Sequence, residues 1–332
     1  MKFTLSWLKD HLDTGASLDE IVEGLLDVGL EVEEVVDKAK ELAPFKVARV
    51  KKADKHPNAD RLSVCLVETA EGDVQVVCGA PNARTGMIGI FVHPGAHIPG
   101  TGIDLERGMI RGVESNGMLV SERELMISDE HEGIIDLSGD FKIGTPAAVA
   151  LGLDDPMIYV KVTPNRPDAL GVRGIARDLA AKGLGTLKPL DVKPVRPAFK
   201  SPIDVELRFQ GGDAKPCPLF IGRYFRGVKN LSSPDWLKRR LTAIGLRPIS
   251  ALVDITNYIT VTYSRPLHVF DADKVKAPIH ARLAKDGEEI LALDGRTYRL
   301  DSTMTVIADA QGPQGVGGII GGENSSCTPE TV

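Results

Sequence analysis

The first forty residues carry an apolar pattern with the period of a helix. Ser17 and Glu20 form a capping box, in which each side chain bonds the other residue's backbone N–H. Apolar residues then recur at helical spacing: Leu18, Ile21, Val22, Leu25 and Leu26. Gly29 can end this helix in the left-handed conformation. The acidic run "EVEEVVD" that follows is typical of a solvated strand edge or a linker.

From about Phe45 the pattern changes to short runs rich in β-branched residues. Examples are "FKVARVKKA", "LSVCLVETA", "DVQVVCGA" and "IGIFVHPGA", and turn signals such as Glu71-Gly72 and Asn116-Gly117 separate the runs. Short strands at intervals of about ten residues are typical of a small barrel or sandwich.

A second helical pattern occupies part of residues 156–184. Asp168 is a candidate cap, Leu170, Ile175 and Leu179 form an apolar stripe, and Gly183 is a candidate stop. Prolines then recur at 189, 194, 197 and 202, and this density predicts an extended, semi-rigid connector. We expect a domain boundary there.

The last third mixes helix and strand signals. Ser233 is the expected cap of a helix that has Pro234 in its first turn and ends at Gly245. The Asp294-Gly295 pair between alternating residues predicts a hairpin. The glycine-rich run from Gly315 to Gly322 is a flexible loop or a backbone that approaches something closely, and it matches no phosphate-binding motif.

One stretch, "VDITNYITVTYSRPLHVFD", places a Thr-Asn pair and a histidine close together. Thr256, Asn257 and His268 lie within thirteen residues, beside Arg247 and Arg265, and the apolar positions between them indicate a strand and its exit. By itself the pattern also fits a hydrogen-bonded core histidine near a turn.

Composition limits the classes of protein to which the chain can belong. The 332 residues are 42% hydrophobic and 26% charged, which is usual for a globular protein of two or three domains. No apolar run approaches the ~20 residues of a membrane helix, so no membrane partner is expected. The four cysteines, which have neither disulfide-scaffold nor zinc spacing, indicate a reducing cytoplasm: Cys65, Cys78, Cys217 and Cys327.

Charge is distributed unevenly along the chain. Residues 39–148 contain 12 Lys and Arg against 16 Asp and Glu, a net charge of −4, whereas residues 199–332 contain 17 against 15, a net charge of +2. A protein that grips a phosphate backbone usually presents a basic face. If a nucleic acid is a partner, the sequence predicts a local site and not a long basic trough.

Several motifs together resemble one family. The motifs are, in chain order, "MKFTLSWLKDHL" with "GLEVEEV", then "HPNADRLSVCLVE", "VVCGAPNARTG" and "IRGVESNGMLVSERELM", then "VTPNRPDALGVRGIARDLA", and finally "GLRPISALVDITNYITVTYSRPLHVFDADKV" with "LDGRTYRL" and "VGGIIGGE". Their content and order are similar to the N-terminal part of the bacterial phenylalanine–tRNA ligase beta subunit. The resemblance covers essentially the whole chain.

The resemblance implies an α+β multidomain architecture. Residues 1–38 with 149–190 would form a small α/β unit, and residues 39–148 would form an inserted OB-fold barrel of the tRNA-binding type. Residues 191–202 would be the Pro-rich linker, and residues 203–332 an α+β editing domain that is incomplete at its C-terminus. The chain departs from the family at Ala251 and Leu252 and across Thr260–Arg265, and the family's editing-pocket glutamate would lie beyond Val332.

The resemblance also implies a function and a site. The holoenzyme would attach phenylalanine to tRNA(Phe), and this chain would carry hydrolytic editing of Tyr-tRNA(Phe). The implied editing pocket consists of Thr256, Asn257, His268 and Gly318, with Arg247 at a phosphate of the tRNA end. We expect no metal or cofactor on this chain, ATP and Mg²⁺ for the holoenzyme, an alpha subunit in a heterotetramer, and a cytoplasmic location.

Two alternatives remain open: a non-catalytic tRNA-binding module and a stand-alone trans-editing hydrolase. In residues 39–148 the candidate RNA contacts are Lys51, Lys52, Asn82, Arg84, Ser115 and Asn116. Lysines and Arg49 give a basic edge between residues 46 and 55, but aromatic residues on which bases could stack are few. Two interpretations of this segment therefore stay open: a structural scaffold and a domain that contacts tRNA.

Overall fold

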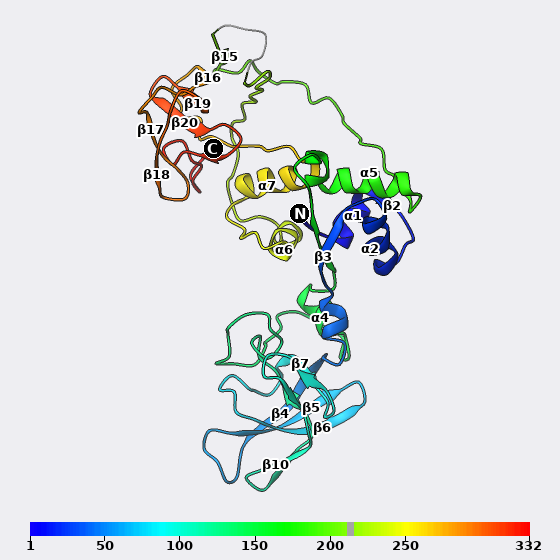
Figure 1. Cartoon of the computed structure of the whole chain (residues 1–332). Helices are drawn as coiled ribbons and strands as arrows, with labels where there is room; N and C mark the ends of the chain where they lie inside the picture. The colour runs from blue at the N-terminus through cyan, green and yellow to red at the C-terminus, as the bar shows by residue number, and fades with distance from the viewer. Residues whose placement is uncertain (211–215) are drawn as a thin grey trace. The chain divides into compact units, whose positions relative to one another are not determined.

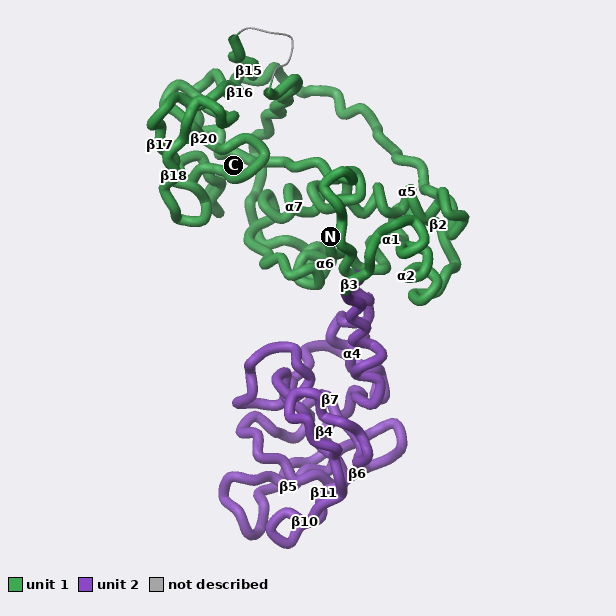
Figure 2. The backbone as a smooth tube through the Cα atoms, in the orientation of Figure 1, with its two compact units in different colours: residues 1–33, 159–332 green, residues 34–158 purple. Residues whose placement is uncertain are grey.

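The computed structural model describes residues 1–210 and 216–332. The chain divides into two compact units: residues 1–33 with 159–332, and residues 34–158 (Figure 2). Figure 1 labels the main helices and strands of both units.

The helices of the first unit come from both ends of its sequence. They are α1 (Leu5–His11), α2 (Leu18–Asp27), the 3-10 helix η1 (Pro167–Leu170), α5 (Val172–Lys182), α6 (Asp235–Ala243) and α7 (Ala251–Tyr263). Helix α1 packs on α5, and α5 and α6 both pack on α7. Trp7, Leu8, Ile175 and Leu179 are fully buried, so the apolar stripes of the helices form a shared core.

The predicted start and end of α2 are confirmed. The Ser17 Oγ accepts a hydrogen bond from the Glu20 N–H, and a Glu20 carboxylate oxygen accepts one from the Ser17 N–H at 2.7 Å. Gly29 follows the helix with a φ of +80°. Because these contacts join residues close in sequence, local chemistry alone determines this helix.

The prediction that Asp168 caps α5 is wrong. Gly171 occupies the cap position, and Asp168 lies in η1, where it forms ion pairs with Arg166 and Arg177. Leu170 also leaves the expected apolar stripe, since it is 48% exposed. Gly183 ends α5 in the left-handed conformation, as predicted.

Short sheets complete the first unit. Strand β1 (Lys2–Thr4) belongs to a three-stranded sheet of order β1-β13-β3 with β13 (Met157–Lys161) and β3 (Glu31–Val36), and β2 (Leu12–Asp13) pairs with β14 (Thr186–Leu187). Residues 188–197 have no regular secondary structure.

The C-terminal part of this unit contains a five-stranded sheet of order β15-β16-β19-β20-β21. Its strands are β15 (Val205–Arg208), β16 (Ile279–Leu283), β19 (Thr305–Asp309), β20 (Gly312–Val316) and β21 (Ile320–Gly321). Strands β15 and β16 are parallel, and the other pairs are antiparallel. The predicted hairpin at Asp294-Gly295 is confirmed between β17 (Glu289–Leu291) and β18 (Thr297–Arg299).

The strand predicted within residues 253–271 is wrong, because this segment begins as helix α7. Tyr258 stacks on Trp7 with 5.1 Å between ring centroids, and the Trp7 Nε1–H donates to the Thr262 Oγ1 at 3.2 Å. Residues four apart share a face only in a helix, so these two contacts select helix over the strand that the β-branched residues favour.

The predicted cap Ser233 has a different role. Pro234 occupies the cap position of α6, and the Ser233 hydroxyl donates to the Asp254 carboxylate at 2.5 Å. Asp254 is fully buried in the first turn of α7 and also accepts the Ile249 N–H at 2.9 Å. The serine therefore satisfies a buried charge that would otherwise destabilise the fold. Gly245 follows α6 with a φ of +83°.

The second unit is built on a five-stranded antiparallel sheet of order β12-β7-β4-β5-β6. The strands are β4 (Lys46–Lys55), β5 (Ser63–Thr69), β6 (Gly72–Cys78), β7 (Ile88–Val92) and β12 (Met118–Leu119). Two ribbons pair β8 (His97–Ile98) with β9 (Ile103–Asp104) and β10 (Gly108–Ile110) with β11 (Val113–Ser115), and the helices are α3 (Lys38–Glu41) and α4 (Ala147–Leu151).

The two faces of this sheet bury separate apolar clusters. Phe45, Val47 and Ile90 belong to one, and Ala48, Cys65 and Phe91 belong to the other. The α+β organisation of the chain is thus confirmed, whereas the sheet of the second unit corresponds to half of a barrel. A closed OB barrel stays a proposal.

Candidate functional site

Helix α7 carries the predicted Thr-Asn pair. The Thr256 hydroxyl donates to the Val253 carbonyl at 2.7 Å, and the Thr256 carbonyl accepts the Thr260 hydroxyl at 2.8 Å. Threonine hydroxyls often bond back to the preceding helical turn in this way. The Asn257 side chain, which is half-buried, makes no hydrogen bond to any other residue described. Its amide is therefore free to bind a ligand.

A hydrogen bond connects α7 to the segment that contains His268. The Thr260 Oγ1, which donates to Thr256, also accepts the Leu267 N–H at 3.2 Å. This contact joins the residue before His268 to the helix that carries Thr256. Of the four predicted pocket residues, Thr256 and His268 are thus linked through neighbours, and no hydrogen bond joins Asn257 or Gly318 to His268 in the described part of the chain.

His268 lies against the glycine-rich run at Gly321. A Cβ placed on Gly321 would lie 2.2 Å from the His268 Cε1 and 3.0 Å from a Leu293 methyl. Real side chains do not approach this closely, so only glycine at position 321 leaves room for the imidazole. The pocket predicted from the sequence includes Gly318 of this run and does not include Gly321.

Gly318, the predicted glycine, lies in the turn between β20 and β21. Its φ is +75°, and a Cβ there would meet no atom within 4 Å. Glycine is therefore favoured by the turn conformation, and the space beside it is open.

The His268 ring is crowded although the residue keeps access to solvent. Phe270 lies edge-on at 4.4 Å between ring centroids, and Gly321 covers the Cε1 edge. Burial lowers the pKa of His268 below its usual value of 6.5. The imidazole is accordingly neutral at physiological pH, when one ring nitrogen donates a hydrogen bond and the other accepts one.

The segment after His268 is anchored to the end of the chain. The buried Asp271 accepts the Thr331 hydroxyl at 2.7 Å, and the Asp271 N–H donates to the Ser325 carbonyl at 2.9 Å. These bonds fix both sides of the candidate site, since Ser325 follows the glycine-rich run.

Two arginines that flank helix α7 in the sequence have no acidic partner among the described residues. Arg247 and Arg265 are exposed, and neither forms an ion pair within residues 1–210 and 216–332. An unpaired exposed guanidinium is available to a phosphate.

The predicted RNA contacts of the second unit are mostly occupied. Lys51 pairs with Asp73 at 2.9 Å, Lys52 with Asp54 at 2.6 Å, and Arg84 with Asp136 at 2.8 Å. Each of these pairs neutralises a charge that a phosphate contact would use.

The polar candidates of the second unit also have structural partners. The Asn82 side chain exchanges two hydrogen bonds with the Ile134 backbone, at 2.8 and 3.0 Å. The buried Ser115 hydroxyl accepts the Val77 N–H at 3.0 Å. Asn116 differs, because its side-chain oxygen is buried and has no hydrogen-bond partner in the structure as described.

A cavity of about 280 Å³ lies in the second unit, away from the candidate site. Its polar lining includes Ser121, Glu124, His131 and Glu132. One Glu124 oxygen already accepts both the N–H and the hydroxyl of Ser121, at 2.5 and 2.8 Å. We assign no function to this cavity.

Metal and thiol chemistry find no site among the residues described. No group of three or more His, Cys, Asp and Glu side chains is arranged to hold a metal ion there. Burial raises the pKa of the Cys65 thiol to about 12, so this cysteine is not an activated nucleophile. In the same part of the chain, no helix is long and apolar enough to cross a membrane.

Two family models match the chain. A B3/4 domain matches residues 216–332, and a "Putative tRNA binding domain" matches residues 45–146. The first match contains α7, His268 and the glycine-rich run, and the second contains the five-stranded sheet of the other unit.

Individual relatives match this chain from its first residue to its last. The chain is 58% identical to a phenylalanine–tRNA ligase beta subunit from Cereibacter sphaeroides and 57% identical to one from Paramagnetospirillum magneticum. Each match covers 100% of this chain and 42% of the relative. A solved N-terminal fragment of the Pyrococcus horikoshii phenylalanyl-tRNA synthetase beta subunit is 16% identical, covers 54% of each chain and has a TM-score of 0.27, so we draw no argument from it. The chain spans about two fifths of the length of the curated relatives that it matches, and along all of its own length it belongs to the phenylalanine–tRNA ligase beta subunit family.

Proposed function

We propose that this chain serves in a phenylalanine–tRNA ligase, where it supports attachment of phenylalanine to tRNA(Phe) and carries the site that hydrolyses Tyr-tRNA(Phe). The observation that carries the proposal is the position of His268, whose ring fits against Gly321 within the segment that matches the B3/4 domain. The Thr260 hydroxyl links helix α7 to this histidine: it donates to the Thr256 carbonyl and accepts the N–H of Leu267, the residue before His268.

A ligase for phenylalanine needs a second site for a physical reason. A pocket shaped for an aromatic ring cannot strongly reject a ring that adds one hydroxyl, and discrimination of this kind reaches only about 10²-fold. A separate pocket that hydrogen-bonds the phenol rejects phenylalanine instead, because phenylalanine leaves buried polar groups unpaired.

The candidate residues suit hydrolysis of an activated ester. Ester hydrolysis at tRNA requires an oriented water molecule and support for the oxyanion, and a covalent nucleophile is unnecessary. The free Asn257 amide supplies donors for a carbonyl oxygen. The neutral His268 orients water or the terminal ribose, and Thr256 supplies a hydroxyl acceptor. Open space beside Gly318 leaves room for the aminoacyl group, and Arg247 binds a phosphate of the tRNA end.

The remaining parts of the proposal concern the assembled enzyme. The partner is an alpha subunit in a cytoplasmic heterotetramer, and ATP and Mg²⁺ are used by the holoenzyme outside this chain. We propose residues 39–148 as an inserted OB-type domain within a unit formed by 1–38 and 149–190, and residues 203–332 as the editing domain after a linker at 191–202. The alternative of a tRNA-binding module is supported by the tRNA-binding domain model.

Replacement of His268 tests the function directly. In the complete ligase, His268→Ala should slow deacylation of preformed Tyr-tRNA by roughly 10²–10³-fold, as when a transition-state hydrogen bond is removed. Phenylalanine charging should remain unchanged. The control is His97→Ala, which removes an exposed histidine of the other unit. Deacylation by His268→Ala at the rate of the unaltered enzyme would contradict the editing role.

A further inference from the structure

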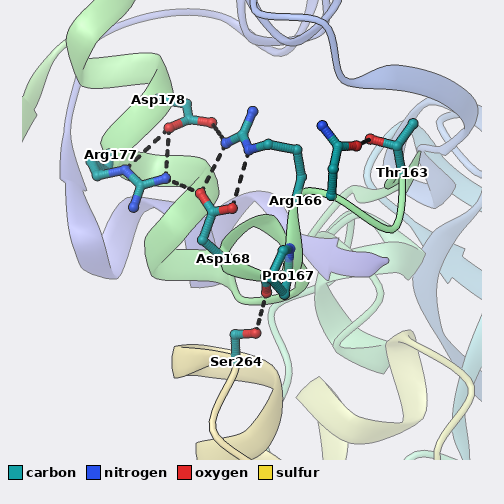
Figure 3. Close-up of polar contacts among 8 residues, drawn as sticks. Thr163, Arg166, Pro167, Asp168, Arg177, Asp178 and Ser264 are labelled. Carbon is teal, nitrogen blue, oxygen red and sulfur yellow. Dashed lines mark hydrogen bonds and ion pairs between the residues drawn. The ribbon is translucent and has the colours of Figure 1, made fainter.

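Four charged residues form a closed network around η1 and α5 (Figure 3). The Arg166 guanidinium donates to both Asp168 oxygens, at 3.1 and 3.0 Å, and also pairs with Asp178. Arg177 pairs with Asp168 and with Asp178, the latter at 3.0 Å. Each arginine therefore bridges both carboxylates, and the planar guanidinium groups fix the geometry of the turn between them.

The network is charged throughout the physiological range. Hydrogen bonds from Arg166, and then from Arg177, hold the pKa of Asp168 well below its usual value. Isolated ion pairs at partly exposed positions add little stability, because water screens them. A network with bidentate contacts, in contrast, holds the backbone of the residues that form it in one arrangement.

This turn contacts the end of α7. The Ser264 hydroxyl donates to the Pro167 carbonyl, which lies between Arg166 and Asp168 in the sequence (Figure 3). On the other side of η1, a Cβ on Gly171 would lie 2.4 Å from the Ser264 N and 2.9 Å from the Tyr263 carbonyl carbon. Glycine at 171 thus permits direct backbone contact, and the turn touches Ser264 from two sides.

Ser264 is the residue at which the chain leaves α7 toward His268. Its φ is +54°, a left-handed conformation that is uncommon for serine and depends on its surroundings. Three residues later, the Leu267 N–H bonds to the Thr260 Oγ1, and His268 then fits against Gly321. Any change in the direction of the chain at Ser264 would move His268 relative to α7.

We propose that Arg166, Asp168, Arg177 and Ser264 are positioning residues for His268. The ion-pair network fixes the Pro167 carbonyl, this carbonyl fixes Ser264, and Ser264 sets the path of residues 265–268. The inference rests on the proposed function of the His268 site. It adds that residues about a hundred positions earlier in the chain control the geometry of that site.

The test combines two variants of the link with a rescue and a control. Asp168→Asn removes the charge that both arginines bind, and Ser264→Gly removes the hydroxyl while it keeps the left-handed conformation accessible. Ser264→Asn is the rescue, because asparagine tolerates this conformation and retains a donor. Asp27→Asn is the control, since it removes a 2.8 Å ion pair to Lys182 on the same helix α5 without touching Ser264.

Two quantities are measured for each variant of the complete ligase. One is the single-turnover rate of Tyr-tRNA deacylation, with phenylalanine charging in parallel, and the other is hydrogen exchange at the Leu267 amide. Asp168→Asn and Ser264→Gly should each slow deacylation by about 10- to 100-fold, as expected from a small displacement of a reacting group, and should speed exchange at Leu267. The double variant should be no slower than the slower single variant, and Ser264→Asn should restore most of the rate.

The outcomes separate this proposal from the function on which it rests. Unchanged exchange at Leu267, or an equal loss of deacylation in Asp27→Asn, overturns the positioning role. If His268→Ala edits normally while Asp168→Asn still speeds exchange at Leu267, the positional link holds and the proposed function fails. If His268→Ala abolishes editing and Asp168→Asn changes neither quantity, the function holds and the positioning role fails.

Discussion

The two parts of the chain with candidate tRNA contacts use their polar side chains in opposite ways. In residues 34–158, Lys51, Lys52 and Arg84 are each paired with an aspartate. In residues 216–332, Arg247 and Arg265 have no ion-pair partner among the residues described. Of these five basic side chains, only the two in the second region have a charge that no acidic side chain neutralises in the described structure.

The same contrast holds for amides. Asn82 binds the Ile134 backbone through both its oxygen and its nitrogen, whereas the Asn257 amide has no protein partner in the described structure. A polar group that already satisfies a buried backbone cannot change partners without loss of stability. We propose from this contrast that these residues of the first region serve mainly as a scaffold and that those of the second bind the tRNA.

If the binding groups lie in the second region, replacement of Gly321 should give the largest loss of editing. In Gly321→Ala the new methyl would lie 2.2 Å from the His268 Cε1, so the imidazole must move. We expect Tyr-tRNA deacylation to fall by about 10²-fold, with phenylalanine charging unchanged. Single-turnover deacylation checks this, and Gly15→Ala is the control because its Cβ would meet nothing within 4 Å. Normal editing by Gly321→Ala would mean that the contact with His268 is not needed.

A smaller effect is expected at Arg247. Arg247→Ala should weaken binding of tRNA by about tenfold, close to 1.4 kcal/mol, and reduce the slope of log affinity against log salt by about one. Filter binding at several salt concentrations measures both quantities. Lys238→Ala is a matched control, since this partly exposed lysine lies nearby in the sequence but has Asp235 as an acidic neighbour at 3.8 Å. An unchanged salt slope would remove Arg247 from the phosphate contacts.

Replacement of the paired lysines should have a smaller effect still. The triple variant Lys51→Gln, Lys52→Gln, Lys55→Gln should lower tRNA affinity by less than about tenfold, because two of the three charges are already neutralised. Glutamine avoids the new repulsion that glutamate would create beside Asp73. A larger loss with a reduced salt slope would break the comparison and establish a phosphate contact in residues 34–158.

The smallest expected effect is a dependence of stability on pH. Burial lowers the pKa of His268 in the folded chain, so the unfolded chain binds a proton first as pH falls. The neutral histidine therefore contributes fully to the free energy of unfolding above about pH 6.5. This contribution is lost progressively as pH falls from 6.5 toward the lower pKa of the folded state. Denaturant titrations from pH 8 to 5 should show a shallower decline in His268→Gln than in the unaltered protein. Identical declines would mean that the surroundings of the ring do not lower its pKa in solution.

Features set by neighbouring residues could be predicted from the sequence. The Ser17–Glu20 capping box, the Gly29 stop and the Asp294-Gly295 turn each depend on atoms a few positions apart, and all three occur as expected. The choice of the 253–271 segment and the glycine-rich run as a site followed from residue types together with the family resemblance. The structure brings these two segments together at Gly321, which the predicted pocket does not include.

Other features depended on partners distant in the sequence. Helix α7 replaces the predicted strand because Trp7 contacts both Tyr258 and Thr262. Ser233 and Asp168 do not cap the expected helices: Ser233 bonds to the buried Asp254, and Asp168 pairs with two arginines. The sequence by itself thus determined the local turns, caps and periodicities, whose free energy comes from adjacent residues. Tertiary structure alone decided which charges are neutralised, which glycine faces His268 and which conformation α7 adopts, because burial and ion pairing between distant segments outweigh local propensities of a few tenths of a kcal/mol, about the scale of intrinsic preferences.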